Sequence, residues 1–215
     1  MPEIIFNGPD GRLEGRYVHS KTENAPVVLV LHPHPQGGGT MNNKVVYNLY
    51  NTFTQRGFSA LRFNFRGVGR SQGRFDNGQG ELADAAAALD WVQSHNPDAA
   101  ACWIAGFSFG AWIGMQLMMR RPEIDGFISI APLASVHDFT FLAPCPASGL
   151  LVHGDQDDII PEESVAKLAE KLGKQKNISI TYNVIKGGDH FFTNKIPAME
   201  KHVEAYLDKS LATAE

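Results

Sequence analysis

The sequence is poor in the features that mark exported, membrane-spanning and nucleic-acid-binding chains. Its 215 residues include only two cysteines, Cys102 and Cys145, which lie far apart and favour reduced thiols over a disulfide framework. Basic residues are not in excess: the net charge is −4, which disfavours nucleic acid as a partner. No apolar run approaches the roughly 20 residues of a membrane helix, and the start MPEIIFNGPDGR lacks the basic and apolar pattern of a signal peptide. These absences predict a cytoplasmic protein that binds neither membrane nor nucleic acid.

What is present suits a globular enzyme-sized domain. Hydrophobic residues make up 43% and charged residues 20% of the chain, so a sizeable core is expected, and the length predicts a single domain over residues 1–215. Residues 3–6 and 13–20 flank the turn sequence GPDG and predict a β-hairpin. Further strands are expected over residues 27–31, 59–65, 101–107, 126–131, 149–154 and 178–185, and helices over residues 41–55, 81–95, 111–121, 161–175 and 196–211.

This alternation predicts an α/β fold. A hairpin followed by repeated strand–helix units gives a mostly parallel sheet of about eight strands with helices on both faces. Ligands of such sheets bind at the carboxyl ends of the strands. The residues that directly follow each predicted strand are therefore the candidates for a functional site.

One serine lies where a strand is predicted to end and a helix to begin. Ser108, in GFSFG (106–110), matches the pattern G-x-S-x-G. A sharp strand-to-helix turn lifts such a hydroxyl out of the sheet, and the glycines remove side chains that would collide in the turn. The following helix points its unpaired N–H groups and positive dipole end at the site. The pattern alone is weak, and a serine that only caps a helix is the alternative.

A serine hydroxyl needs a positioned base, which is itself held by a third group. His190 follows the last predicted strand, in GGDHFF, at the same edge as Ser108, and it is the predicted base. His153, at the end of a strand, is the weaker competitor. The order Ser, Asp, His is the one expected for this topology. The segment GDQDD supplies three candidate acids, Asp155, Asp157 and Asp158.

Over essentially its whole length the chain resembles an α/β hydrolase. HPHPQGGGTMNNK (32–44), followed by FNFRGVGRSQGRFDNG (63–78), is most similar to the small bacterial hydrolases of that superfamily that lack a cap domain. The resemblance implies that the acid is the aspartate of HG-x-x-D, here Asp157, and that the base is His190. Many relatives carry D-x-R-G-x-G-x-S where this chain has N-F-R-G-V-G-R-S, with Asn64 in the first position.

The stretch HPHPQGGGT (32–40) is consistent with three uses. A metal site formed by His32 and His34, with Asp189 as an acidic ligand, would be incomplete. A phosphate-binding loop would need G-x-x-x-x-G-K-[ST], which is missing here. An oxyanion hole remains, built from one N–H after the nucleophile and one from the loop after the first parallel strand. Because the prolines have no N–H, the expected donors are the backbone groups of His34 and Phe109.

Together these residues predict a serine hydrolase that acts by acyl transfer, with no metal or other cofactor. Ser108 would be the nucleophile, His190 the base and Asp157 the acid that orients it. Residues 131–148 are too few for a cap domain, so an open site for small or extended acyl substrates is expected. Carboxylesterase activity on a small-molecule acyl substrate is the prediction. A thioesterase or peptidase would use the same triad, and a binding protein without turnover is the alternative from another class.

Overall fold

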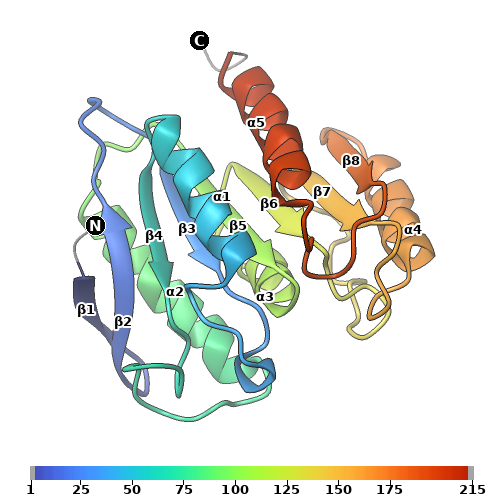
Figure 1. The fold of residues 1–215 in the computed structure, drawn as a ribbon. Helices are drawn as coiled ribbons and strands as arrows, with labels where there is room; N and C mark the ends of the chain where they lie inside the picture. Colours follow the sequence, from blue (N-terminus) through green and yellow to red (C-terminus); the bar gives the residue numbers. More distant parts are fainter. Residues whose placement is uncertain (1–2, 213–215) are drawn as a thin grey trace.

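A sheet of eight strands runs through the residues that the computed structural model describes, 3–212 (Figure 1). The strands are β1 (Glu3–Gly8), β2 (Gly11–Val18), β3 (Val27–Leu31), β4 (Ser59–Phe63), β5 (Cys102–Phe107), β6 (Gly126–Ile130), β7 (Ser148–Gly154) and β8 (Ile180–Ile185). Their order is β1-β2-β4-β3-β5-β6-β7-β8. The β1–β2 hairpin is antiparallel and β2 pairs antiparallel with β4, whereas β4, β3 and β5 to β8 are parallel. The predicted mostly parallel sheet with an N-terminal hairpin is confirmed.

Helices cover both faces of this sheet. They are α1 (Lys44–Gln55), α2 (Gln79–Ser94), α3 (Phe109–Met118), α4 (Glu162–Gly173) and α5 (Ile196–Ala212), with a short 3₁₀ turn at Pro35–Gly37. Helices α1 and α5 lie in front of the sheet in Figure 1 and share one hydrophobic core with it. Helices α2, α3 and α4 supply residues to the core on the other face.

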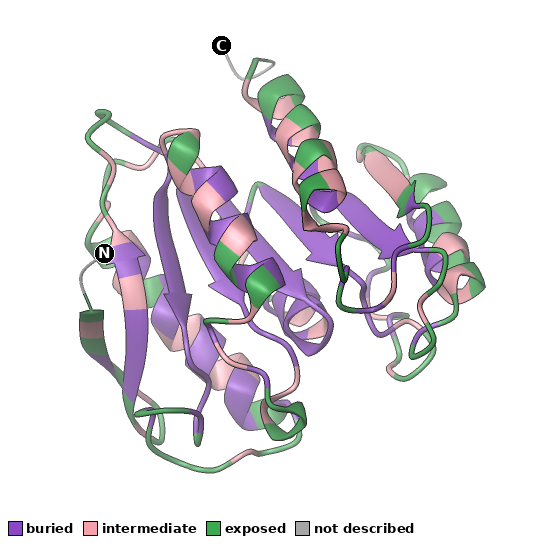
Figure 2. Cartoon of the chain, in the orientation of Figure 1, coloured by how far each residue is buried: buried purple, intermediate pink, exposed green. Residues whose placement is uncertain are grey.

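Strand β3 contributes side chains to the hydrophobic cores on both faces of the sheet. Successive side chains of a strand point to opposite faces. Val27, Leu29 and Leu31 accordingly pack into the core of α2 and α3, while Val28 and Val30 pack into the core of α1 and α5. All five are fully buried (Figure 2), and burial of each such side chain contributes about 1.5–3 kcal/mol. A continuous apolar run is therefore required where both faces are covered.

Most predicted boundaries differ from the observed ones by one to three residues, and two of these differences have a clear local reason. Helix α1 begins at Lys44 instead of residue 41, because the Asn43 carbonyl Oδ1 accepts the Val45 N–H at 2.9 Å and caps the helix there. Strand β4 ends at Phe63 instead of residue 65, because the Phe65 N–H donates to a histidine ring and not to a neighbouring strand. Both shifts lengthen the loops at the carboxyl edge of the sheet.

The segment between β6 and β7, residues 131–147, contains no helix or strand. The chain therefore has the lidless form of its fold, as the length of this segment predicted. None of the helices within residues 3–212 combines the length and apolar character required to cross a membrane.

Candidate active site

Ser108 occupies the sharp turn between β5 and α3. Its φ of 56° and ψ of −115° place a non-glycine residue in a region that L-residues rarely adopt, at a cost of about 1–3 kcal/mol. The surroundings hold this conformation: the Ser108 N–H donates to the Ile130 carbonyl on β6 at 2.8 Å. Only 5% of Ser108 is exposed. This backbone conformation directs the hydroxyl away from the sheet.

The two glycines of GFSFG are required by close backbone approach. A Cβ at Gly106 would lie 2.4 Å from the Gly110 carbonyl oxygen, and a Cβ at Gly110 would lie 2.4 Å from the Leu31 carbonyl oxygen. Neither distance is tolerable because the neighbouring atoms are backbone. The motif therefore brings α3 directly onto the carboxyl end of β3, next to the loop that begins at His32.

Ser108, His190 and Asp157 are linked by hydrogen bonds. His190 Nε2 lies 2.9 Å from Ser108 Oγ, and His190 Nδ1 lies 2.7 Å from Asp157 Oδ2. Since the carboxylate can only accept, Nδ1 carries the proton, and Nε2 is left free to accept from the serine hydroxyl. His190 is 3% exposed. The structure thus links the three side chains that were predicted from the sequence. It also places His190 in the tautomer that would accept a proton from Ser108.

Asp157 is held as an anion by several donors. Burial alone would raise its pKa, but the hydrogen bond to His190 and those from the Ile160 and Ile159 N–H groups to Oδ1, at 2.8 and 2.9 Å, hold the pKa below its ordinary value. Asp155 instead accepts the Gly187 N–H, and Asp158 is exposed. The structure therefore separates the three carboxylates that residue patterns alone left open.

His153 is buried beside this group but faces another partner. Its Nε2 donates to the Ile160 carbonyl at 2.9 Å and lies 3.5 Å from Asp157 Oδ2. Burial lowers the pKa of His153, which keeps the ring neutral. Ser108 is hydrogen-bonded to His190, so the geometry favours His190 over His153 as the base.

The expected oxyanion donors are both free to donate. Within residues 3–212, neither the His34 nor the Phe109 backbone N–H is hydrogen-bonded to another residue. Phe109 is the first residue of α3 and follows Ser108 directly. The His34 ring packs against the Phe109 ring, with centroids 5.0 Å apart, which ties the HPHP loop to the start of α3. Two N–H groups without protein acceptors therefore occur in the two segments from which an oxyanion hole would be built.

The His32 side chain cannot serve as a metal ligand in this arrangement, because both ring nitrogens bind the protein. Nδ1 lies 2.7 Å from the Pro33 carbonyl, and Nε2 accepts the Phe65 N–H at 3.0 Å. Full burial lowers the pKa of His32 to about 4, against an opposing effect of the Pro33 bond. Among the residues described, no group of three or more potential ligands is placed to hold a metal ion.

Polar side chains of β4 and the segment after it hold the same loop, and the sequence did not reveal their role. Arg62 donates through Nη1 to the Met41 carbonyl, and Asn64 Oδ1 accepts the Met41 N–H at 2.8 Å. The Asn64 amide also donates to Glu14 Oε1 at 2.6 Å. An aspartate at position 64 would set two carboxylates against each other, so the asparagine at this position suits Glu14. Polar residues within a buried strand were the only available signal.

The burial of His32 predicts a stability effect of pH. The unfolded chain binds a proton at His32 below about pH 6.5, whereas the folded protein excludes it until about pH 4, so acid favours unfolding. The contribution of His32 to the free energy of unfolding is fully present above pH 6.5. Below that pH, down to pH 4, the contribution falls by about 1.4 kcal/mol per pH unit. In denaturant titrations from pH 7.5 to 4.5, the stability difference between the parent and His32→Asn should shrink as pH falls. Parallel curves would contradict the neutral buried state.

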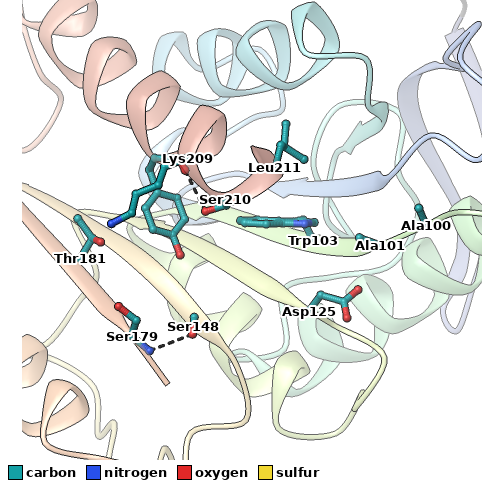
Figure 3. A pocket seen from close by; sticks show the side chains of 11 residues that line it. Ala100, Ala101, Trp103, Asp125, Ser148, Ser179, Thr181, Lys209, Ser210 and Leu211 are labelled. Atoms are coloured by element: carbon teal, nitrogen blue, oxygen red, sulfur yellow. Dashed lines mark hydrogen bonds between the residues drawn. The ribbon is translucent and has the colours of Figure 1, made fainter. Parts of the chain in front are cut away.

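A separate cavity of about 460 Å³ lies at the opposite edge of the sheet (Figure 3). Its walls include Ala101, Asp125 and Ser148, which precede or begin parallel strands, whereas Ser108 follows one. Asp125 Oδ2 accepts the Cys102 N–H at 2.8 Å, so this carboxylate holds the start of β5. The cavity therefore does not belong to the candidate active site.

The fold and the linked serine, histidine and aspartate define the class of an α/β serine hydrolase. The chain belongs to the α/β-hydrolase superfamily and, within it, to the family described as X-Pro dipeptidyl-peptidase (S15 family), which matches residues 16–143.

Three relatives are similar over nearly the whole chain. Protein RP471 of Rickettsia prowazekii is 54% identical, covering 96% of this chain and 89% of that protein. The crystal structure of ATU1826 from Agrobacterium tumefaciens, a protein of unknown function, is 60% identical with a TM-score of 0.97, covering 99% and 97% of the two chains. XC6422 of Xanthomonas campestris, described as an α/β serine hydrolase without a lid, is 32% identical with a TM-score of 0.86, covering 97% and 94%.

Proposed function

We propose that this protein is a carboxylesterase that hydrolyses small or extended acyl esters through an acyl-enzyme on Ser108. The observation that carries the proposal is the continuous hydrogen-bonded chain from Ser108 Oγ through His190 to Asp157. Two backbone N–H groups that have no hydrogen-bond acceptor among residues 3–212, those of His34 and Phe109, support it. This combination supplies a nucleophile, a base, an orienting anion and an oxyanion hole.

In the acylation step, Ser108 Oγ bonds to the ester carbonyl carbon while its proton passes to His190 Nε2. The carbonyl oxygen becomes an oxyanion, which the N–H groups of His34 and Phe109 stabilise. His190 Nε2–H then gives the proton to the leaving alkoxy oxygen as the C–O bond breaks. Asp157 stays ionised throughout, because its donors hold its pKa low, and it stabilises the charged imidazole.

In the deacylation step, water takes the place of the alcohol. His190 Nε2 removes a proton from water as its oxygen attacks the acyl carbon, and the same N–H groups stabilise the second oxyanion. The proton returns to Ser108 Oγ as the acyl bond breaks, releasing the carboxylic acid. The net reaction consumes one water and needs no other co-reactant.

The surface at this edge supports apolar acyl groups as substrates. Val136, Ile159 and Phe191 follow β6, β7 and β8, and each is a large hydrophobic side chain about half exposed or more. The Phe191 ring also contacts the His190 ring, with centroids 5.2 Å apart. An exposed apolar side chain such as Phe191, in contact with the reacting histidine, can bury part of an acyl chain without a lid.

The experiment that tests this proposal is a substrate panel on the purified protein. p-Nitrophenyl esters of acetate to decanoate, the matched thioesters and Gly-Pro p-nitroanilide would be compared by kcat/KM, with Ser108→Ala as the blank. Esters are expected to give the highest values. A clear preference for Gly-Pro p-nitroanilide would replace the esterase proposal by a dipeptidyl-peptidase, which the family match favours as the second candidate.

The role proposed for His34 predicts different results for two substitutions. His34→Ala keeps the backbone N–H and should retain much of the activity, with a loss caused by missing ring contacts to Phe75 and Phe109. His34→Pro deletes the donor and should lower kcat by about 10²–10³-fold. Circular dichroism would check that the proline variant folds.

EDTA serves as the matched control in the same assay, and it should leave the parent rate unchanged. Severe loss in His34→Ala together with inhibition by EDTA, restored by added metal, would contradict the oxyanion role.

A further inference from the structure

We infer that the His32 side chain is a positioning residue for the oxyanion hole, which it sets by fixing the peptide unit that carries the His34 N–H. The inference rests on the acyl-transfer function proposed above. It assigns a function to a fully buried histidine that the triad does not use.

The peptide bond between Pro33 and His34 is planar. The Pro33 carbonyl and the His34 N–H belong to one rigid unit and point in opposite directions when the bond is trans. His32 Nδ1 lies 2.7 Å from the Pro33 oxygen, an obligate acceptor. Holding that oxygen fixes the rotation of the plane, and so it fixes the direction of the His34 N–H.

The tautomer that this bond requires is imposed from the other side of the ring. The Phe65 N–H can only donate, and it is bonded to His32 Nε2 at 3.0 Å. Nε2 must therefore be the acceptor and Nδ1 the donor. Burial opposes protonation of the ring, so the tautomer stays fixed at neutral pH.

The peptide unit on the other side of His34 is held as well. The His34 carbonyl accepts the N–H groups of Gly37 and Gly39, each at 3.0 Å. Gly39 also lies against the Pro33 carbonyl, since a Cβ there would come within 2.1 Å of that oxygen. The two carbonyls that flank the His34 N–H are therefore both bonded, and the N–H between them is the group left for a ligand.

Two substitutions separate the two bonds of His32. In His32→Asn, the amide Nδ2 occupies the place of the ring Nδ1 and can still donate to the Pro33 carbonyl, but nothing reaches the Phe65 N–H. In His32→Gln, the longer side chain places its Oε1 near the former Nε2 and can accept from Phe65, but the donor to Pro33 is lost. Each variant serves as the control for the other, because both place the same uncharged amide group at this buried position.

The measurements are kcat and KM for a p-nitrophenyl ester, and the inhibition constant of an alkyl trifluoromethyl ketone. This ketone adds to Ser108 and places an oxyanion in the hole. His32→Gln should lose about 10- to 100-fold in both kcat and ketone affinity, with little change in KM. His32→Asn should stay within a few-fold of the parent in both, even where its melting temperature is the lower of the two.

A ketone affinity that is unchanged in His32→Gln, or an equal loss in both variants, would overturn the inference. If the glutamine variant does not fold, ¹⁵N spectra of the parent decide: the inference requires a neutral His32 protonated at Nδ1 and a His34 amide shifted by the ketone. A parent that hydrolyses no ester and binds no ketone would contradict the proposed function instead.

Discussion

Replacing Ser108 with alanine should lower kcat for p-nitrophenyl butyrate by at least about 10³-fold. The alanine can keep the backbone conformation and the N–H bond from residue 108 to Ile130. It removes Ser108 Oγ, which is the nucleophilic atom hydrogen-bonded to His190 Nε2. Any residual rate would come from the oxyanion donors and from substrate binding. Hydrolysis followed at 405 nm, with active protein quantified by unfolding curves, provides the measurement.

The matched control for this change is Ser94→Ala, which alters an exposed serine in the last turn of α2. It should retain the parent rate. Turnover by a folded Ser108→Ala protein within ten-fold of the parent would contradict the acyl-enzyme mechanism.

Replacing Asp157 with asparagine should lower kcat by about 10⁴-fold, as expected when the orienting acid of such a triad is neutralised. The structure gives a specific reason. The N–H groups of Ile159 and Ile160 both donate to Asp157 Oδ1, so the amide oxygen of asparagine would take that position and its NH₂ would face His190 Nδ1. The imidazole would then carry its proton on Nε2 and could not accept from Ser108.

Asp155→Asn and Asp158→Asn are the matched controls, because they make the same chemical change two residues before and one residue after Asp157. The Asp155 carboxylate accepts the Gly187 N–H, which an asparagine oxygen can also accept, and Asp158 is exposed. Each variant should stay within a few-fold of the parent. If either of them loses most of the activity, the assignment of Asp157 is wrong.

The fold followed from patterns that are local in the sequence. The continuous apolar run of β3 reflects burial on both faces. The alternation of strands and helices predicted a mostly parallel sheet, which the structure confirms, but it did not predict the order of the strands. Ser108 could be selected because GFSFG is a contiguous motif, and its two glycines are required where the backbone packs too closely for a Cβ atom. His190 could be selected by its place after the last strand.

The remaining parts of the site depend on contacts that residue patterns do not reveal. Without the family resemblance, the three carboxylates of GDQDD could not be separated, because the choice depends on the contact of Asp157 with His190, 33 residues further along the chain. The polar side chains that hold the HPHP loop, Arg62 and Asn64, come from β4 and the residue after it, and no spacing rule links them to Met41. The register between β3 and β4 creates these contacts, and it was not accessible from the sequence.

The most direct test of the account is mass spectrometry of the protein after reaction with an alkyl fluorophosphonate. Such a probe phosphonylates a serine only where a base activates it and an oxyanion hole stabilises the adduct. We expect one adduct per chain, located on Ser108 by peptide mapping, formed far more slowly in the Asp157→Asn protein and prevented by an ester substrate. A parent protein that stays unlabelled, or that carries the adduct on another serine, would contradict this expectation.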